Sequence, residues 1–333
     1  MKKRATIYDV AKDAGVSIAT VSRYLKGLNV IAPATCSRLE KSIKKLAFKP
    51  SFLATSLARK SRHSVGLIVP SGERAYKDLF LSEIISGVTE AAGKAGWTVH
   101  LSMLGSVIDD KKLLQYHSEL VDGSLILDAA LDSPAVKDLI KEGHIAVAIN
   151  RADNALPWII VDNINGALKA ARYLYSLGHK RIAGIGEKKG VGEMRLNGFA
   201  AGFKECKLEQ SWILDSKMSK EKTYEIVKKL LKQKNAPTAF VLASDWISAG
   251  AYKAIYELGL KIPDKISVVG FDDTLLAEAL VPSLTTVRQP LHKMGKLAFE
   301  IFTALLNKDI NVSKQILLEP ELVIRNSTAK YYL

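Results

Sequence analysis

Cysteine and long apolar runs are both scarce in this 333-residue sequence. Only Cys36 and Cys206 are present, so a disulfide framework is excluded, and two cysteines so far apart match no zinc-ligand spacing. No run approaches the ~18 uncharged apolar residues that a membrane helix needs. Asp9, Lys12 and Asp13 interrupt the apolar region that a signal peptide would require after its basic start. We therefore expect a soluble protein of the reducing cytoplasm, with no metal or other cofactor.

The sequence also lacks the motifs of nucleotide-dependent and nucleophilic enzymes. A glycine-rich turn at 184–190 follows a predicted strand, but it has three residues, not two, before its last glycine. A Walker A run and a Gly-x-Ser-x-Gly elbow are absent, and the six histidines stand near no obvious nucleophile. We expect no catalytic residue. An enzyme built on a doubly wound sheet remains the remote alternative.

Acidic residues are rare in the first 64 positions, which hold 14 lysines and arginines against 3 acids. This stretch carries +11 of the formal net charge of +14, so the rest of the chain is nearly balanced. A basic domain attached to a near-neutral body is typical of proteins that bind nucleic acid.

The stretch 6–25 predicts two short helices joined by a tight turn. Thr6 can cap the first helix, with Asp9 three residues later completing a capping box. Gly15 can adopt the left-handed conformation that ends this helix, and Ser17 can cap the second. This is a helix-turn-helix, and the face of its second helix that is free to read a DNA groove carries Ile18, Ala19, Ser22 and Arg23.

This stretch resembles the headpiece of the LacI/GalR family of bacterial transcription regulators in three motifs: IYDVA at 7–11, AGVS at 14–17 and TVSR at 20–23. Similar motifs continue almost to the C-terminus, among them VGFDD at 269–273 and LVIRNST at 322–328. The resemblance implies a sequence-specific DNA-binding regulator, a repressor, that binds a palindromic operator. It also implies a homodimer, with a tetramer as the alternative, and control by a small-molecule effector.

Two further segments complete the expected DNA-binding part. A third helix is predicted over 33–46, with Ala32 in place of the serine cap that is usual in the family. A short helix over 52–58 resembles the hinge helix of the family, in which the residue at the Leu57 position wedges into the minor groove. The expected DNA-contacting residues are Thr6, Ser17, Ile18, Ala19, Thr20, Ser22, Arg23, Ala54 and Leu57.

From Val65 onward, short apolar runs alternate with amphipathic stretches, which is typical of parallel sheets covered by helices on both faces. The pattern occurs twice and predicts an α/β core of two doubly wound lobes, the periplasmic-binding-protein-like core of the family. In that family the chain crosses between the lobes three times. We expect a headpiece at 1–48, a hinge helix and linker at 49–62 and an effector-binding and dimerisation core at 63–333, with lobe one at about 63–161 and 290–320 and lobe two at about 162–289 and 321–333.

An effector site is expected between the lobes, because ligands of doubly wound sheets bind beyond the C-terminal ends of the strands. Arg195 and Asp272 suit a polyhydroxylated ligand, since hydroxyl groups can satisfy buried charged groups. A structural ion pair between the two across the cleft is the alternative. We predict a sugar effector that contacts Phe80, Leu81, Asp162, Arg195, Ser244, Trp246 and Asp272.

Other effectors stay open at this point. The resemblance allows a nucleobase or nucleoside effector, and it also allows a phosphocarrier protein as co-effector. The family often has asparagine at Ser244, and the loop 71–78 lacks the family's Asn-Pro-Phe-Phe run. The identity of a family ligand therefore does not transfer to this chain.

Overall fold

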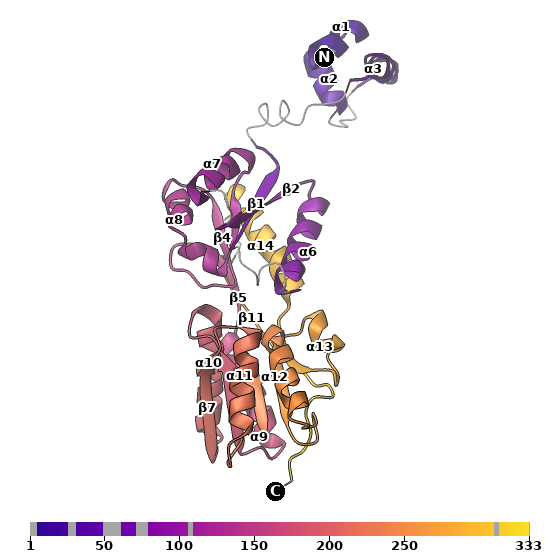
Figure 1. Cartoon of the computed structure of the whole chain (residues 1–333). Helices are drawn as coiled ribbons and strands as arrows, with labels where there is room; N and C mark the ends of the chain where they lie inside the picture. The colour runs from indigo at the N-terminus through magenta and orange to yellow at the C-terminus, as the bar shows by residue number, and fades with distance from the viewer. Residues whose placement is uncertain are drawn as a thin grey trace. The chain divides into compact units, whose positions relative to one another are not determined.

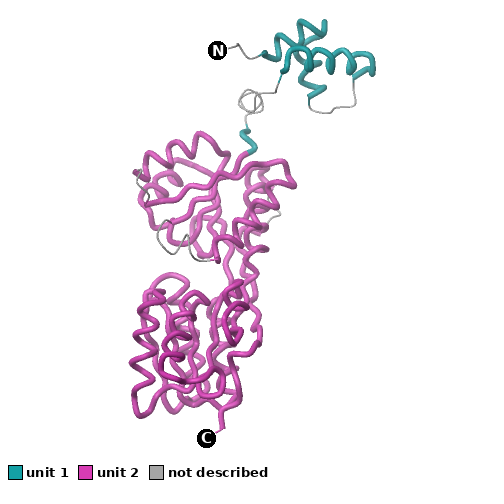
Figure 2. The backbone as a smooth tube through the Cα atoms, turned by 45° about the vertical axis from the view of Figure 1, so that its right-hand side comes forward, with its two compact units in different colours: residues 1–63 teal, residues 64–333 magenta. Residues whose placement is uncertain are grey.

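The computed structural model describes residues 5–25, 31–48, 61–70, 79–105, 109–309 and 313–332 (Figure 1). The chain divides into two compact units, residues 1–63 and 64–333 (Figure 2). The predicted hinge helix, with Ala54 and Leu57, lies outside the described residues.

The described residues of the first unit form three helices: α1 (Ile7–Ala14), α2 (Ile18–Leu25) and α3 (Pro33–Lys45). The predicted capping box is confirmed, because the Thr6 backbone N–H donates to Asp9 Oδ2 at 2.8 Å and the Asp9 N–H bonds back to the Thr6 hydroxyl. Gly15 ends α1 with a left-handed φ of 62°. Ser17 Oγ accepts a hydrogen bond from the Thr20 N–H at 3.2 Å, so it caps α2 as predicted.

Each of these helices contributes one fully buried residue to a small core: Val10, Val21 and Leu39. Phe48 closes this core from the segment after α3. Ala32 gives α3 no side-chain cap, in agreement with the departure seen in the sequence. The burial of Val21 fixes which side of α2 faces inward and leaves the opposite side to solvent.

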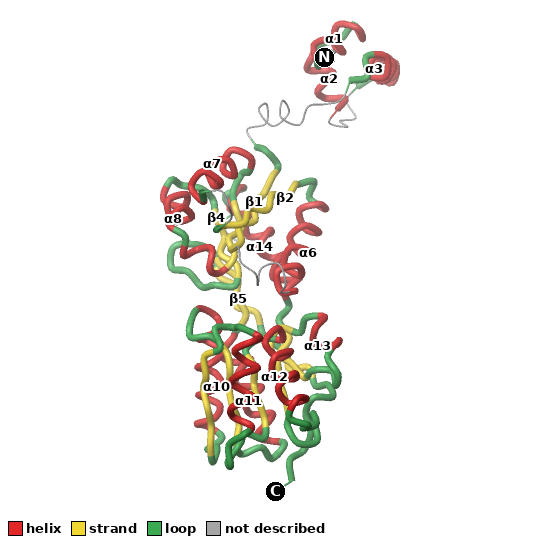
Figure 3. The backbone as a smooth tube through the Cα atoms, viewed as in Figure 1, coloured by secondary structure: helices red, strands yellow, loops and turns green. Residues whose placement is uncertain are grey.

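Lobe one of the second unit is built on a six-stranded parallel sheet in the order β11-β5-β4-β3-β1-β2. Its strands are β1 (Ser64–Pro70), β2 (Thr98–Leu104), β3 (Ser124–Leu127), β4 (Ala146–Ile149), β5 (Trp158–Val161) and β11 (Gln315–Leu318). Its helical segments are α6 (Leu79–Lys94), α7 (Asp110–Leu120), the 3₁₀ turn η1 (Asp128–Asp132), α8 (Pro134–Lys141) and α14 (Leu291–Leu306) (Figure 3).

Lobe two is built on a second six-stranded sheet in the order β12-β10-β9-β8-β6-β7. Its strands are β6 (Arg181–Gly186), β7 (Gln210–Asp215), β8 (Ala239–Leu242), β9 (Ser267–Asp272), β10 (Thr285–Arg288) and β12 (Glu321–Val323). Its helices are α9 (Asn163–Ser176), α10 (Gly190–Glu205), α11 (Lys220–Leu231), α12 (Asp245–Glu257) and α13 (Leu275–Ala279). Two doubly wound lobes are thus confirmed, although β12 runs antiparallel to β10.

The chain passes between the lobes three times, after β5, after β10 and after β11. The late strand β11 completes the first sheet by pairing with β5, with Gln315 opposite Trp158. The chain then turns directly into β12, which pairs with β10 in the other sheet. Because β12 follows β11 without a crossover helix, it enters the second sheet in the reverse direction.

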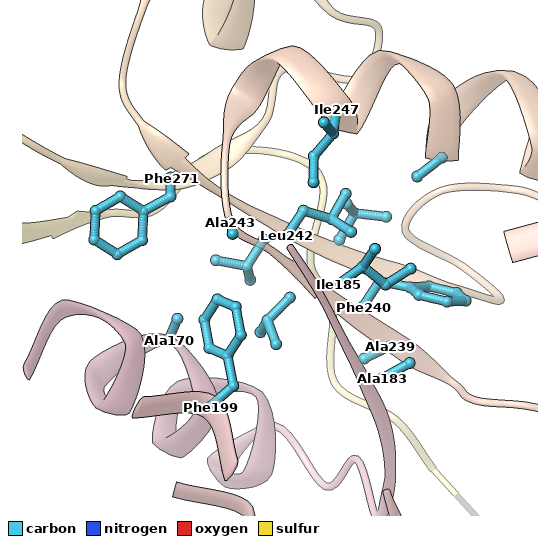
Figure 4. Close-up of a cluster of buried hydrophobic side chains, with 14 of the residues drawn as sticks. Ala170, Ala183, Ile185, Phe199, Ala239, Phe240, Leu242, Ala243, Ile247 and Phe271 are labelled. Carbon is cyan, nitrogen blue, oxygen red and sulfur yellow. The ribbon is translucent and has the colours of Figure 1, made fainter. Parts of the chain in front are cut away.

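The core of lobe two lies on both faces of its sheet (Figure 4). Phe199 of α10 and Ala170 of α9 pack on one face, and Ile247 of α12 packs on the other. A Cβ atom on Gly198 would lie 2.6 Å from the Cβ of Ala167, so α9 and α10 approach too closely for any larger residue there. This packing fixes the position of α10, which carries Arg195.

One buried histidine in each lobe bonds to hydroxyl groups from two separate segments of its sheet. His117 bonds to Ser102 at 2.7 Å and to Ser124 at 2.9 Å in lobe one. His179 bonds to Thr238 and Ser267, both at 2.9 Å, in lobe two. Burial is the main cause that lowers the pKa of each imidazole to about 4, and His144 and His100 add to the effect at His117. Both histidines are therefore neutral in the folded protein at neutral pH.

The protein should lose stability as the pH falls from 6.5 towards 4. In this window the unfolded chain binds protons at both histidines while the folded chain does not, at a cost of roughly 2 kcal/mol per histidine at pH 5. His179→Gln should remove about half of this dependence. Tyr116→Phe, an exposed substitution that leaves both histidines in place, should leave it unchanged. Urea unfolding at pH 7 and pH 5 measures the pH dependence of the free energy of unfolding for both variants. If this dependence were unchanged in His179→Gln, the conclusion that His179 is neutral in the folded protein would be refuted.

Candidate DNA-binding face and effector cavity

The side of α2 opposite Val21 forms a mixed polar and apolar strip. Its exposed residues are Ser17, Ile18, Ala19 and Arg23, and Thr20 and Ser22 are half-buried. Ile18 is 40% exposed although it is large and apolar, which leaves its side chain available for contact with thymine methyl groups. A helix of this kind can enter the major groove of DNA and place such side chains against base edges.

The positively charged side chains near this strip differ in whether they form ion pairs within the protein. Lys45 Nζ lies 2.7 Å from Asp13 Oδ1, so part of its charge is compensated. Arg23 and Lys44 are exposed and form no ion pair among the described residues. Thr6 is also exposed, but its hydroxyl is already engaged in the capping box with Asp9. Arg23 is thus the charged side chain of the strip that can reach a base without breaking an ion pair.

In the second unit, a cavity of about 210 Å³ opens between the two lobes. Lobe one contributes Pro70, Phe80, Leu81, Leu127, Asp128, Ala129 and Asn150. Lobe two contributes Glu187, Lys189, Val191, Gly192, Arg195, Met218 and Asp272. The volume is below the ~300 to 1,000 Å³ of drug-sized pockets, so it suits a small ligand of about one ring.

A buried ion pair forms the floor of the cavity in lobe two. Arg195 Nη1 donates to Asp272 Oδ1 at 3.0 Å and to the Ala243 carbonyl at 2.6 Å. Arg195 Nε donates to Asn163 Oδ1 at 2.8 Å, and the guanidinium lies 4.0 Å from the centroid of the Phe271 ring. Arg195 and Asp272 are each only 2% exposed. The guanidinium is therefore held by α9, β8 and β9 at once.

The Asp272 carboxylate is equally well supported. Ser244 Oγ donates to its Oδ2 at 2.7 Å, and Gln289 Nε2 donates to its Oδ1 at 2.6 Å. Its backbone adopts a φ of 118°, a conformation that residues with a Cβ rarely adopt. The pair with Arg195 joins α10 to β9, so it lies within lobe two and does not cross the cleft as the alternative reading supposed.

Four of the seven predicted effector residues line the cavity: Phe80, Leu81, Arg195 and Asp272. Ser244 is fully buried behind Asp272. Asp162 caps α9, with its Oδ1 accepting the Asn165 N–H at 3.0 Å. The Trp246 ring lies 5.2 Å from the Lys220 ammonium, because α12 starts at Asp245 and turns this side chain towards α11. Asp162, Ser244 and Trp246 therefore do not line the cavity, which corrects the prediction for these three residues.

Sequence reasoning missed several cavity residues for which a signal existed. Asp128 follows the apolar run of β3 and Asn150 follows that of β4, so the rule that identified Asp272 also applied to them. Glu187 and Lys189 belong to the glycine-rich turn that was considered only as a phosphate loop. No sequence signal pointed to Met218, which reaches the cavity from the loop before α11.

One ion pair connects the two lobes at the rim of the cavity. Lys189 Nζ of lobe two lies 3.5 Å from Asp132 Oδ2 of lobe one, and Arg151 Nη1 donates to Asp132 Oδ1 at 2.8 Å. The hydrogen bond from Arg151 is the main cause that lowers the pKa of Asp132. The Lys189 side chain is 69% exposed, and an exposed pair of this kind contributes at most ~1 kcal/mol. The rim contact is therefore weak compared with the buried pair.

The described part of the chain contains no group of three or more His, Cys, Asp or Glu side chains that could hold a metal ion. Within the same residues, no helix combines the length and the apolar composition needed to cross a membrane.

Arg195→Ala should destabilise lobe two strongly. It leaves the buried Asp272 carboxylate without its counter-charge, and breaking a buried pair in this way costs about 3 to 5 kcal/mol. Arg172→Ala is the matched control, because it removes an exposed pair with Glu205 at 2.7 Å and should cost less than ~1 kcal/mol. Urea unfolding followed by circular dichroism compares the two, and equally small losses would contradict a structural role for the buried pair.

The two parts of the chain match two known family models. Residues 6–51 match the bacterial regulatory proteins of the lacI family, and residues 171–328 match the periplasmic binding protein-like domain. Among curated relatives, the HTH-type transcriptional regulator DegA of Bacillus subtilis (strain 168) is 33% identical over 339 residues and covers 98% of each chain. The HTH-type transcriptional repressor PurR of Vibrio parahaemolyticus serotype O3:K6 is 31% identical over 341 residues, with 98% of this chain and 99% of the relative covered.

Solved structures agree in fold over almost the whole length. The lac repressor dimer bound to operator and an anti-inducer has a TM-score of 0.83 at 26% identity and covers 98% of this chain and 100% of its own. The complex of the transcriptional regulator CelR with cellobiose has a TM-score of 0.72 at 27% identity and covers 97% of this chain and 100% of its own. With both the sequence relatives and the architecture in agreement from headpiece to core, this chain belongs to the LacI family of bacterial regulatory proteins.

Proposed function

We propose that this DNA-binding regulator is a cytoplasmic repressor, that it binds a palindromic operator as a homodimer, and that a sugar bound between its lobes controls it. One observation carries the proposal: a single chain combines the exposed reading face of α2 with a small cavity between two lobes. A regulator needs both parts, because an effector can shift DNA binding only if it binds the two lobe arrangements with different affinity.

Operator binding is supported by the chemistry of the headpiece. Arg23 can pair with guanine through two hydrogen bonds, whereas Ile18 and Ala19 suit thymine methyl groups. The basic residues of α3 add attraction to phosphates without selecting a sequence. The relatives also support this part, because PurR is named as a repressor and the matched lac repressor structure is a dimer bound to operator. Contacts from Thr6, Ala54 and Leu57 remain part of the proposal.

A homodimer is supported by three exposed large apolar side chains of lobe two, on or beside α12 and α13: Tyr256, Leu275 and Val281. These side chains are 83%, 69% and 89% exposed, and exposed apolar surface can mark a site of protein association. The Tyr252 hydroxyl, one turn before Tyr256, donates to the Pro282 carbonyl at 2.9 Å, which holds the segment with Val281 against α12. A second copy of the chain would cover these side chains. Nothing comparable among the described residues supports a tetramer.

A sugar effector is supported by the small cavity and by the side-chain oxygen atoms in its wall, which belong to Asp128, Asn150, Glu187 and Asp272. The matched CelR structure contains cellobiose, which is one example of a sugar on this fold. A nucleobase is the second candidate, but among the described residues Phe80 is the only aromatic side chain that lines the cavity, and a planar base is usually stacked on aromatic rings. No observation favours a phosphocarrier partner or a catalytic activity.

Two variants separate base readout from general attraction to DNA. Arg23→Ala should relax the base preference at one pair of symmetric operator positions. It should also weaken operator binding by about 1 to 3 kcal/mol per recognised guanine. Lys44→Ala, the matched control on α3, should weaken binding equally for all sequences and reduce the slope of log K against log salt by about one per subunit. Selection from random DNA with each variant, followed by salt titrations, tests both. An unchanged consensus for Arg23→Ala would contradict the assignment.

The dimer and the effector are tested with the full-length protein. The selected operator should be palindromic and should bind two chains, as measured by light scattering of the complex. Tyr256→Glu should weaken dimerisation and, with it, operator affinity, while the exposed substitution Lys229→Glu on α11 should not. A monomer bound to a non-palindromic site would overturn the proposal.

A further inference from the structure

Glu40 of α3 is one of only three acidic residues among the first 64, which hold 14 lysines and arginines. A carboxylate in a domain that binds DNA repels the phosphates, so each acid lowers the affinity. The other two acids have structural partners, because Asp9 completes the capping box of α1 and Asp13 pairs with Lys45 of α3. The partner of Glu40 therefore indicates what the third carboxylate contributes.

Glu40 accepts a hydrogen bond from α2, the helix that carries the reading face. The Tyr24 hydroxyl donates to Glu40 Oε1 at 3.0 Å. Partial burial raises the pKa of the Tyr24 hydroxyl, and the hydrogen bond to Glu40 adds to this rise, so the phenol stays protonated and remains a donor. In the described part of the headpiece, no other side-chain hydrogen bond joins α2 to another helix.

The small core of the headpiece holds α2 at few points. Val21 is the one buried residue of α2, whereas α1 buries Val10, Ala11 and Ala14. Tyr24 lies three residues after Val21, and therefore on the same face of α2, about 4.5 Å further along the helix axis. Its ring packs against the same core, and its hydroxyl adds a bond with a defined direction. Apolar contacts alone permit a helix to rotate slightly, and a directional bond away from Val21 prevents that rotation.

The rotation of α2 matters for DNA readout because Arg23, the exposed neighbour of Tyr24, lies on this helix. A guanidinium donates to both acceptors of a guanine only within a narrow range of positions, about 0.5 Å and 10 to 20° for a binding group of this kind. A small rotation of α2 would misplace Arg23 for this contact. The general attraction to phosphates, which depends on charge and not on orientation, would be unchanged.

We propose that Tyr24 and Glu40 are positioning residues for base readout, because their hydrogen bond sets the rotation of α2 on α3 and so the position of Arg23 in the major groove. The inference rests on the proposed function, since it assumes that α2 reads bases. Neither Tyr24 nor Glu40 has to contact DNA for this role. The hydrogen bond raises the ratio of operator affinity to non-specific affinity, although the charge of Glu40 lowers both affinities.

Three variants of the full-length protein test the inference on two duplexes of equal length: the operator selected from random DNA with the unmodified protein, and a scrambled sequence of the same composition. Tyr24→Phe keeps the ring but removes the bond. It should bind scrambled DNA as before and reduce the ratio of operator to scrambled affinity about fivefold or more, the lower end of what one bidentate pair contributes. Glu40→Ala should reduce the ratio equally while raising the affinity for scrambled DNA. Glu40→Gln keeps an acceptor without the charge, so the ratio should be rescued.

Asp13→Asn is the matched control, because it removes a headpiece charge and an ion pair with Lys45 without touching α2. It should raise the affinity for both duplexes and leave their ratio unchanged. In an Arg23→Ala background, Tyr24→Phe should no longer change the ratio, because the bond acts through Arg23. Circular dichroism shows whether each variant is folded.

An unchanged ratio in folded Tyr24→Phe or Glu40→Ala would overturn the inference. An equal loss of affinity of Tyr24→Phe for both duplexes, or a full effect of Tyr24→Phe in the Arg23→Ala background, would also overturn it, because the Tyr24 hydroxyl would then act on DNA directly. In these cases the proposed function would stand, since Arg23→Ala alone tests base readout. If selection with the unmodified protein returned no consensus, the proposed function would fail and the inference with it.

Discussion

The buried ion pair between Arg195 and Asp272 is the interaction on which the arrangement of lobe two depends. Taking both charges out of water is expensive, and the cost is offset only because further hydrogen bonds satisfy each partner. Asn163, Ala243 and Ser244 supply these bonds from the N-terminus of α9, the end of β8 and the N-terminal cap of α12. A shift of any of these elements would leave a charge unsatisfied, so the pair holds the floor of the cavity in one geometry.

A second buried carboxyl group, that of Asp245, lies near this ion pair and adds to the cost of burying charged groups. Asp245 is fully buried, and its burial together with the nearby Asp272 raises its pKa well above the usual range. Thr286 Oγ1 donates to its Oδ1 at 2.6 Å, and the Thr274 N–H donates to its Oδ2 at 2.9 Å. These bonds anchor α12 to β10 and to the segment after β9. Both hydrogen bonds act against the rise in the pKa of Asp245.

The sequence was sufficient where local patterns decide the structure, and insufficient where contacts distant in the sequence do. The caps at Thr6 and Ser17, the helix at 291–306 and the alternation of strands and helices follow from neighbouring residues. The strand β7 has no clear signal in the sequence, because its run, QSWILD at 210–215, is half polar and lies at the edge of the sheet. The prediction placed Trp246 at the effector because it follows the apolar run AFVLAS at 239–244. That run does not reveal the turn at which α12 starts, and this turn decides which way the Trp246 side chain points.

The buried pair of Arg195 with Asp272 is much stronger than the exposed pair of Lys189 with Asp132. This difference bears on how a bound ligand could change DNA binding. Lobe two is organised by its own buried pair before any ligand enters, so ligand binding has little left to order there. The lobes themselves are joined by three chain crossings and, at the rim, by the exposed pair of Lys189 with Asp132, which holds weakly. Asn150 of lobe one lines the cavity, and its buried Oδ1 accepts no hydrogen bond within the described residues. A ligand that donates to Asn150 and also contacts the lobe-two wall stabilises one relative position of the lobes over others. A ligand can shift a conformational equilibrium only if its interaction free energy differs between the two states, so the simultaneous contact with both walls is the part of the site suited to transmit a signal.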